Sequence, residues 1–300
     1  MNSNAGKSYY GPFFWLTVVS FAVPVVVAVK GFEASRRPYT KPEPKPDACG
    51  VDHRLWDYLL KMYVENGLVD YQGIKRDHLF QTYLRQLGRA QPDKLDTDND
   101  RLALLCNAYN ALVINGVIKH EITQSVDKFS VKKVRFFDLK EHIFAGRTLS
   151  LNHLEHKLIR TEFPEPRVHM ALVCAARSCP VIRAEAYHGK TLPRQLEDQA
   201  RQFANNPKHV GYDAPSNTLH LSKILEWYGD DFKAAGGYRK FLADRVADPT
   251  LRKALLDADG SVKIVFNDYN WSLNSREKRA KGSGAGKGKT DFGSGSVPNE

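Results

Sequence analysis

The stretch DRLALLCNAYNALVINGVIKH, residues 100–120, contains the longest helical pattern in this sequence. Its apolar and small side chains recur every three or four residues, which is the period of an α-helix packed against a core. We therefore predict a helix over Asp100–His120 that presents one face to the core, formed by Leu104, Ala108, Ala111, Leu112, Asn115 and Ile118.

Two amide side chains, Asn107 and Asn110, lie three residues apart on this predicted helix. Buried amides need hydrogen-bond partners. They either bridge backbone groups inside the core or orient a histidine of a functional site. The first interpretation is the simpler one, and we prefer it.

Shorter helices and strands are predicted on both sides of this helix. Because the strands do not alternate regularly with the helices, a doubly wound parallel sheet is not expected. The pattern indicates an α+β fold, a mostly helical single domain with short antiparallel strands. Helices are expected at His53–Asn66, Leu79–Leu87, Ser150–Arg160, from Thr191 to near Pro207, from Ser222, at Tyr238–Val246 and at Pro249–Asp257; hairpins at Glu141–Leu151 and at 209–221; and a late strand at 262–266.

Composition divides the 300 residues into four parts. Residues 1–29 form a membrane anchor or signal segment, and residues 30–48 are a linker rich in proline and charge, which predicts an extended spacer. Residues 49–274 form the globular domain. Residues 275–300 are basic and rich in glycine, with almost no apolar residue, which predicts a disordered tail.

The net charge of +10 does not indicate a nucleic-acid-binding protein. Residues 1–48 and 276–300 each carry an excess of three positive charges, which leaves only four for the domain between them. A nucleic-acid-binding module usually has a concentrated basic face. We therefore expect no nucleic-acid partner.

The segment Gly11–Val29 contains no charged residue and is long enough to cross a bilayer as a helix. It is either a retained anchor or a cleaved signal peptide. The excess of Lys and Arg after the segment favours a cytoplasmic domain by the positive-inside rule. The length of the segment favours a retained anchor over a cleaved signal peptide, and the spacer after it is a plausible stalk. We expect the domain on the periplasmic side of a bacterial inner membrane.

Two of the four cysteines lie in RVHMALVCAARSCPVIRAEAY, residues 167–187. Cys174 and Cys179 could form a disulfide, bind a metal or supply a nucleophile. His169 and Cys174 point apart whether this segment is a strand or a helix. His169 could reach Cys179 if the chain turns at residues 175–178.

Cys179 has the stronger case as a nucleophile. Pro180 suits the first position of a helix, which would make Cys179 the cap residue. Thiols at helix N-termini have lowered pKa values. The alternatives are a Cys174–Cys179 disulfide and simple packing in the core.

Five blocks of the sequence together resemble the family called domain of unknown function 547 (DUF547). The resemblance spans about Leu55 to Asn274 and implies a single domain, whose bacterial members are often exported or linked to a membrane. It also favours Glu155 and His156 as residues that line a site. The blocks are CNAYNALVING (106–116), LSLNHLEHKLIR (149–160), PRVHMALVCAARSCPVIRAEAY (166–187), LSKILEWYGDDF (221–232) and YNWSLN (269–274).

A zinc site formed by Cys174, Cys179, His169 and His156 is possible by ligand type. The spacing of the thiols is longer than in a usual zinc knuckle, and there is no second pair. We expect no metal. The sequence has no glycine-rich phosphate loop and no serine nucleophile elbow, so we expect no nucleotide cofactor and no serine hydrolase.

We predict a membrane-tethered domain with a cysteine-centred site for acyl transfer or hydrolysis. Cys179 is the preferred nucleophile and Cys174 the reserve, His169 or His156 is the base, and Glu155 orients that base. The alternative is a non-catalytic binding or scaffolding domain in which Cys174 and Cys179 form a structural disulfide. The sequence does not name a substrate or a protein partner.

Overall fold

The computed structural model describes residues 39–276, and helix α4, Asp98–Lys119, forms the centre of the larger of its two hydrophobic clusters. Fifteen of its 22 residues are buried. The helix begins earlier than predicted because the hydroxyl of Thr97 caps it by accepting a hydrogen bond from the backbone N–H of Asp100. Its burial on nearly every side makes it the helix on which the others pack.

Three helices pack around α4: α1 (His53–Tyr63), α2 (Tyr71–Arg76) and α3 (His78–Gly88). Each has an aspartate as its cap, whose carboxylate accepts a hydrogen bond from a backbone N–H of the first turn. The helices predicted at residues 53–66 and 79–87 are confirmed with shifted ends. Helix α2 was not predicted, because six residues are too few to show a period.

The strands are short and form small sheets. Within residues 39–276, three antiparallel hairpins form two-stranded sheets of their own, and the predicted hairpin at Glu141–Leu151 is one of them. The predicted fold class, α+β and mostly helical, is confirmed. The hairpins are β1 (Val64–Glu65) with β2 (Leu68–Val69), β3 (Ser130–Val131) with β4 (Val134–Arg135), and β5 (His142–Phe144) with β6 (Arg147–Leu149).

One sheet has three strands, in the order β7 (Val210–Asp213), β8 (Thr218–Leu221) and β9 (Lys263–Phe266). The pair β7–β8 is the predicted second hairpin. Strand β9 pairs with β8 in parallel, which the prediction of antiparallel strands did not include. The chain reaches β9 through α7 (Lys223–Trp227), α8 (Gly237–Ala243) and α9 (Pro249–Leu255), a connection long enough for parallel pairing.

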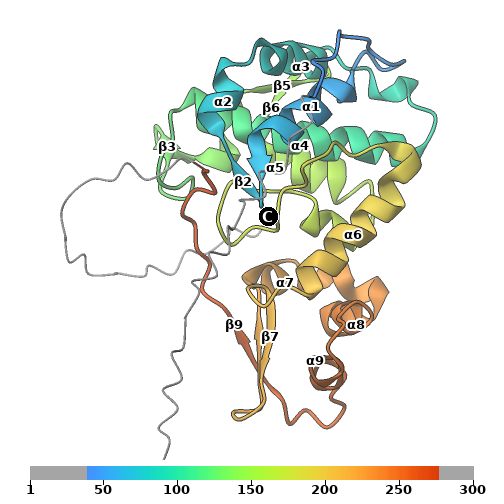
Figure 1. Cartoon of the computed structure of the whole chain (residues 1–300), viewed down its shortest axis with the longest axis vertical. Helices are drawn as coiled ribbons and strands as arrows, with labels where there is room; N and C mark the ends of the chain where they lie inside the picture. The colour runs from blue at the N-terminus through green and yellow to red at the C-terminus, as the bar shows by residue number, and fades with distance from the viewer. Residues whose placement is uncertain (1–38, 277–300) are drawn as a thin grey trace, which may run out of the picture. The chain divides into compact units, whose positions relative to one another are not determined.

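This sheet and helices α7 to α9 enclose the second hydrophobic cluster, and α6 (Leu192–Ala204) joins the two clusters. Leu192 and Leu196 in its first half pack into the cluster around α4, whereas Phe203 near its end packs into the second. Figure 1 shows α6 in yellow, running from the blue and green helices toward the orange ones.

Two local structures differ from the prediction. No helix begins at Pro180, so Cys179 is not a helix cap. The backbone N–H groups of Arg177 and Ser178 donate to the carbonyls of Ser272 and Asn270 instead, and these bonds hold the turn between the two cysteines against residues 270–272. After Ser150, α5 (Leu151–His153) continues as a π-helical turn, Leu154–Ile159, rather than as one α-helix.

Among residues 39–276, one helix is long and apolar enough to cross a membrane. It is α4, and 83% of its most apolar window is buried inside the fold, as in the core helix of a globular domain. The predicted span Gly11–Val29, the first part of the linker and nearly all of the tail lie outside the described residues, so those predictions stand as predictions.

Candidate functional site

All five predicted site residues line one pocket, at the place where elements of the two hydrophobic clusters meet. The volume of the pocket is about 120 Å³. Its wall contains both aromatic rings and polar groups. The lining residues are Tyr109, Val126, Asp127, Arg135, Phe136, Phe137, Asp138, Asn152, Glu155, His156, His169, Leu172, Cys174, Cys179, Pro180, Ile224, Trp227, Tyr228, Tyr269 and Trp271.

Cys174 and Cys179 form a disulfide across a five-residue separation. The chain turns sharply between them, where Ala175 adopts a left-handed conformation with φ 62°. Such a conformation is uncommon for a residue other than glycine and is often found at functional sites. The remaining cysteines, Cys49 and Cys106, are free and buried, and burial raises the pKa of each thiol to about 12, which keeps both protonated.

Both sulfur atoms contact the hydroxyl of Tyr269. Its oxygen lies 3.0 Å from Sγ of Cys174 and donates to Sγ of Cys179 at 3.2 Å. The backbone N–H of Cys174 also donates to Sγ of Cys179, at 2.8 Å. Cys179 therefore has two hydrogen-bond donors aimed at its sulfur, an arrangement that would stabilise a thiolate there after reduction.

His169 is held by Asp231. Its Nε2 lies 2.7 Å from Oδ2 of the carboxylate, and the ring stacks on Tyr228 with centroids 4.1 Å apart. Burial opposes ionisation of Asp231, but the hydrogen bonds from His169 and Arg160 outweigh it and lower the pKa of Asp231. Because the carboxylate accepts, Nε2 of His169 carries a proton, and Nδ1 has a free lone pair when the ring is neutral.

Arg160 joins Asp231 to the second histidine. It donates from Nε and Nη2 to the two carboxylate oxygens, at 2.7 and 2.9 Å, and from Nη1 to Nδ1 of His156 at 2.8 Å. A guanidinium can only donate, so Nδ1 of His156 is the acceptor and its Nε2 carries the proton. Burial lowers the pKa of His156, which keeps this ring neutral near pH 7.

Glu155 does not orient an imidazole, which corrects the predicted role. It is buried and accepts a hydrogen bond from the hydroxyl of Tyr228 at 2.8 Å. Burial and the negative charge of Glu155 raise the pKa values of Tyr228 and Tyr109. The carboxylate that orients a histidine is that of Asp231, which the sequence analysis did not select.

Amide side chains hold the loop that carries His169 and the two cysteines. Asn110 donates to the carbonyl of Ala171 and accepts from the N–H of Val173, each at 2.9 Å. Gln199 donates to the carbonyls of Met170 and Val181, which brings the two ends of this loop together. The preferred interpretation of Asn110, that it bridges backbone groups, is confirmed.

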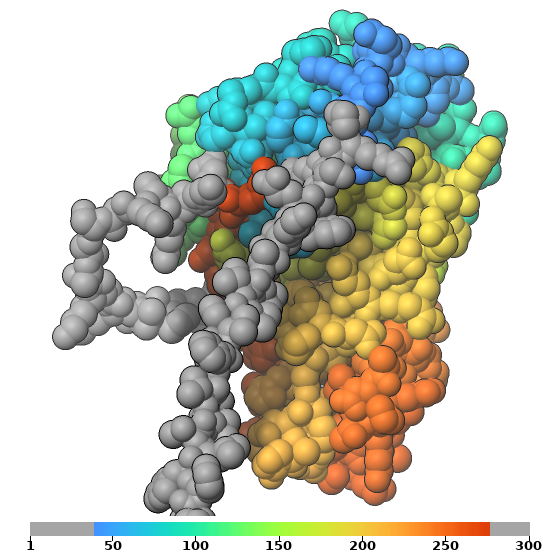
Figure 2. All heavy atoms as spheres, in the orientation of Figure 1, coloured from blue at the N-terminus to red at the C-terminus, as the bar shows by residue number. Residues whose placement is uncertain are grey.

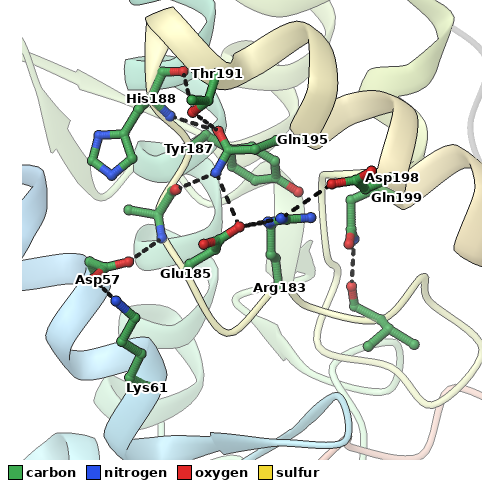
Figure 3. A network of polar contacts seen from close by, with 12 residues as sticks. Asp57, Lys61, Arg183, Glu185, Tyr187, His188, Thr191, Gln195, Asp198 and Gln199 are labelled. Carbon is green, nitrogen blue, oxygen red and sulfur yellow. Dashed lines mark hydrogen bonds and ion pairs between the residues drawn. The ribbon is translucent and has the colours of Figure 1, made fainter. Parts of the chain in front are cut away.

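The segment after Cys179 is fixed in the same way, as Figure 3 shows. Gln195 accepts from the N–H of His188 and donates to the carbonyl of Ala186, whose own N–H donates to Asp57 on α1. Asn107 accepts from the N–H of Tyr187 and donates to its carbonyl. This network attaches residues 183–191 to α1, α4 and α6.

The sequence analysis did not select four residues that line or support the pocket. They are Arg160, Tyr228, Asp231 and Tyr269. Each lies in a block that carried the family resemblance, so a signal was present in the sequence. Spacing does not show that Asp231 contacts His169, because 62 residues separate them. Spacing equally gives no reason to place Tyr269 on a sulfur 90 residues away.

Among the described residues, no group of three or more His, Cys, Asp or Glu side chains is arranged to hold a metal ion. Both sulfur atoms are joined to each other, and the two imidazoles are bonded to Arg160 and Asp231. The zinc alternative, with ligands Cys174, Cys179, His169 and His156, is not assembled.

A family model described as "Protein of unknown function, DUF547" matches residues 92–204. The predicted resemblance is confirmed over this segment. The DUF547 segment contains α4, the predicted site residues and Arg160, whereas Tyr228, Asp231 and Tyr269 lie outside it. Comparison with curated proteins and with solved structures found no match to the chain.

Proposed function

We propose that this DUF547-containing chain is a cysteine-dependent enzyme that transfers or hydrolyses acyl groups of amides or esters in the pocket described above. The observation that carries the proposal is the pair of donors on Sγ of Cys179, the N–H of Cys174 at 2.8 Å and the hydroxyl of Tyr269 at 3.2 Å. Cysteine catalysis depends on a thiolate, and two donors favour that form.

The first step of the proposed reaction opens the disulfide. A dithiol reductant transfers two electrons and two protons to Cys174 and Cys179 and becomes a disulfide itself. His169 then takes the proton of the Cys179 thiol, directly or through a water molecule. Asp231 supports this role because it holds Nε2–H and leaves Nδ1 free to accept.

The thiolate of Cys179 next attacks the carbonyl carbon of the substrate. The resulting thioester retains the acyl group, and the alcohol or amine leaves with the proton from His169. Water or a second nucleophile then releases the acyl group. The neutral ring of His156 offers Nε2–H as a donor to negative charge that develops on the substrate.

A labelling experiment with an acyl probe directed at thiols tests the proposal. We expect no labelling of the oxidised chain, labelling after treatment with a dithiol, loss of that labelling in Cys179→Ala and its retention in Cys174→Ala. If the reduced wild type and both variants label equally, the nucleophile is not in this pair, and the proposal fails.

The second candidate is a binding or scaffolding domain in which the disulfide is purely structural. The Cys174–Cys179 bond itself favours it, because a closed disulfide has no nucleophile. Aromatic rings on the pocket wall would then hold a ligand. Thiol counting by mass spectrometry on protein isolated from its own compartment tests this candidate, because two free thiols at Cys174 and Cys179 would rule it out.

We also propose that Gly11–Val29 tethers the domain to a bacterial inner membrane, on the periplasmic side. The disulfide supports this, because such bonds persist in oxidising compartments. A reporter that is active only outside the cytoplasm, fused after Glu300, should give a signal. A signal from a cytoplasm-specific reporter at the same position would overturn the proposal.

A further inference from the structure

The hairpin β3–β4 lies on the surface of the fold, beside the pocket. All six residues from Ser130 to Arg135 are exposed, and Arg135 together with Phe136, directly after the hairpin, lines the pocket. Figure 1 labels β3 at the edge of the fold, and the green spheres of this region lie at the left edge of the coloured part of Figure 2.

The composition of the hairpin is unusual for a solvent-exposed turn. Val131 and Val134 are paired directly opposite each other, so they share one face, and they are 38% and 41% exposed. The turn between them is made by Lys132 and Lys133, with φ angles of 49° and 69°. Two-residue turns of this kind normally use Asn or Gly, because other residues are strained there.

The charges around the hairpin are mostly positive. Lys128 and Lys140 flank it, and Asp138 pairs with Arg135 at 3.5 Å. Lys132 and Lys133 have no carboxylate partner among the described residues. Among the described residues, the turn therefore combines two lysines that have no carboxylate partner with two partly exposed valines.

We propose that this hairpin docks on an anionic lipid surface, with the lysines contacting lipid phosphates and the valines entering the interfacial layer. The charge of the turn is complementary to anionic headgroups, and exposed apolar residues beside lysines are the pattern of interfacial binding. The docked hairpin brings the adjacent mouth of the pocket close to the bilayer. The inference does not depend on the chemistry in the pocket.

Vesicle capture by the full chain tests this docking. The chain is held in nanodiscs of neutral phosphatidylcholine, so that residues 1–38 are present and equal in every sample. Vesicles of phosphatidylcholine, alone or mixed with phosphatidylglycerol, are added, and co-sedimentation is measured. We expect capture of the mixed vesicles only, with weaker capture at high salt because screening reduces the attraction.

Two variants locate the contact. Lys132→Gln/Lys133→Gln should weaken capture by about 30-fold, since each cation near an anionic surface contributes roughly fivefold. Val131→Ser/Val134→Ser should weaken it by about tenfold through loss of apolar contact. The matched control is Lys190→Gln/Arg194→Gln, which removes the same charge from exposed positions near the start of α6 and should capture vesicles like the wild type.

Three results would overturn the proposal. They are equal capture of neutral and mixed vesicles, unchanged capture by both hairpin variants, and an equal loss in the control variant. The second result would assign any lipid binding to another part of the chain. Unchanged melting temperatures show that the variants remain folded, as expected for six exposed residues.

Discussion

The two halves of the pocket differ in what they contribute. Residues 155–179, inside the segment that the DUF547 model matches, supply the five candidate site residues Glu155, His156, His169, Cys174 and Cys179. Residues 227–271, outside it, supply most of the groups that hold them.

Three pairs connect these halves. Asp231 binds His169, Tyr228 binds Glu155, and Tyr269 binds the sulfur of Cys179. The matched segment therefore contains the candidate chemistry but not its geometry. The second half sets which nitrogen of His169 carries a proton, and the hydroxyl of Tyr269 would stabilise a thiolate of Cys179 after reduction.

Acid should lower the stability of the fold before it breaks the contact between Asp231 and His169, which joins the two halves of the pocket. Burial lowers the pKa values of His53, His142 and His209 to about 4. Between pH 6.5 and 4 the unfolded chain binds more protons, so the free energy of unfolding falls as pH falls. We expect a loss of about 5 kcal/mol in total from pH 7 to pH 5, measured by urea denaturation.

His142→Phe tests the source of that loss. Both ring nitrogens of His142 are buried and have no hydrogen-bond partner, so a phenyl ring should replace the imidazole with little change in packing. Because one of the three histidines is removed, the loss of unfolding free energy between pH 7 and pH 5 should be about a third smaller than in the wild type. His78→Phe, at an exposed position, is the matched control, and an equal change in both variants would refute the assignment.

Asp231→Asn should break the strongest connection between the halves. It leaves the half-buried Arg160 and the buried His169 without their carboxylate, which we expect to cost about 3 kcal/mol of stability in urea denaturation at pH 7. The adjacent Asp230 is 86% exposed, so Asp230→Asn is a matched control with an expected change near zero. Equal effects of the two variants would mean that Asp231 does not connect the halves.

The same connection should persist in mild acid. The pKa of Asp231 is depressed, so its stabilising contribution is present above the ordinary carboxyl pKa of about 3.8 and is lost as pH falls below that value. The side-chain carboxyl carbon of Asp231 should therefore still give the NMR signal of a carboxylate at pH 5. A signal that changes to that of the protonated acid by pH 5, while the fold remains, would contradict the depressed pKa.

Removal of the disulfide should have a smaller effect, because it closes a short loop. Cys174→Ser/Cys179→Ser should cost about 2 kcal/mol of unfolding free energy. A reducing agent should lower the stability of the wild type by a similar amount and leave the double variant unchanged. If the reductant acts equally on both proteins, the disulfide is not the element that it affects.

Tyr269→Phe should have the smallest effect on stability, about 1 kcal/mol, because it removes one hydroxyl and keeps the ring between Trp227 and Trp271. It should also raise the pKa of the Cys179 thiol in the reduced protein, since a donor to the thiolate is lost. The measurement is the pH dependence of alkylation of Cys179, with each tyrosine variant made in the Cys174→Ala protein so that no disulfide forms. Tyr238→Phe serves as the control, and an identical alkylation profile in both variants would remove Tyr269 from the site.

Much of the secondary structure was predictable because its causes are local. The period of residues 100–120 gives α4, and the turn at Ala145 and Gly146 gives the β5–β6 hairpin. The cysteine pair and the two histidines were also found, because reactive side chains near a turn form a recognisable group. Cys179 was selected for a wrong reason, since no helix starts at Pro180.

The sequence by itself determined the long helices, that the fold is α+β, and which side chains of residues 155–179 are candidates for a functional site. Only the tertiary structure decided that β9 pairs in parallel with β8 and that Asp231, rather than Glu155, orients His169. Periodicity is a property of neighbours in the chain, whereas these contacts join residues far apart in the sequence. They form because the packing of two hydrophobic clusters against a shared helix, α6, brings the two halves of the pocket face to face.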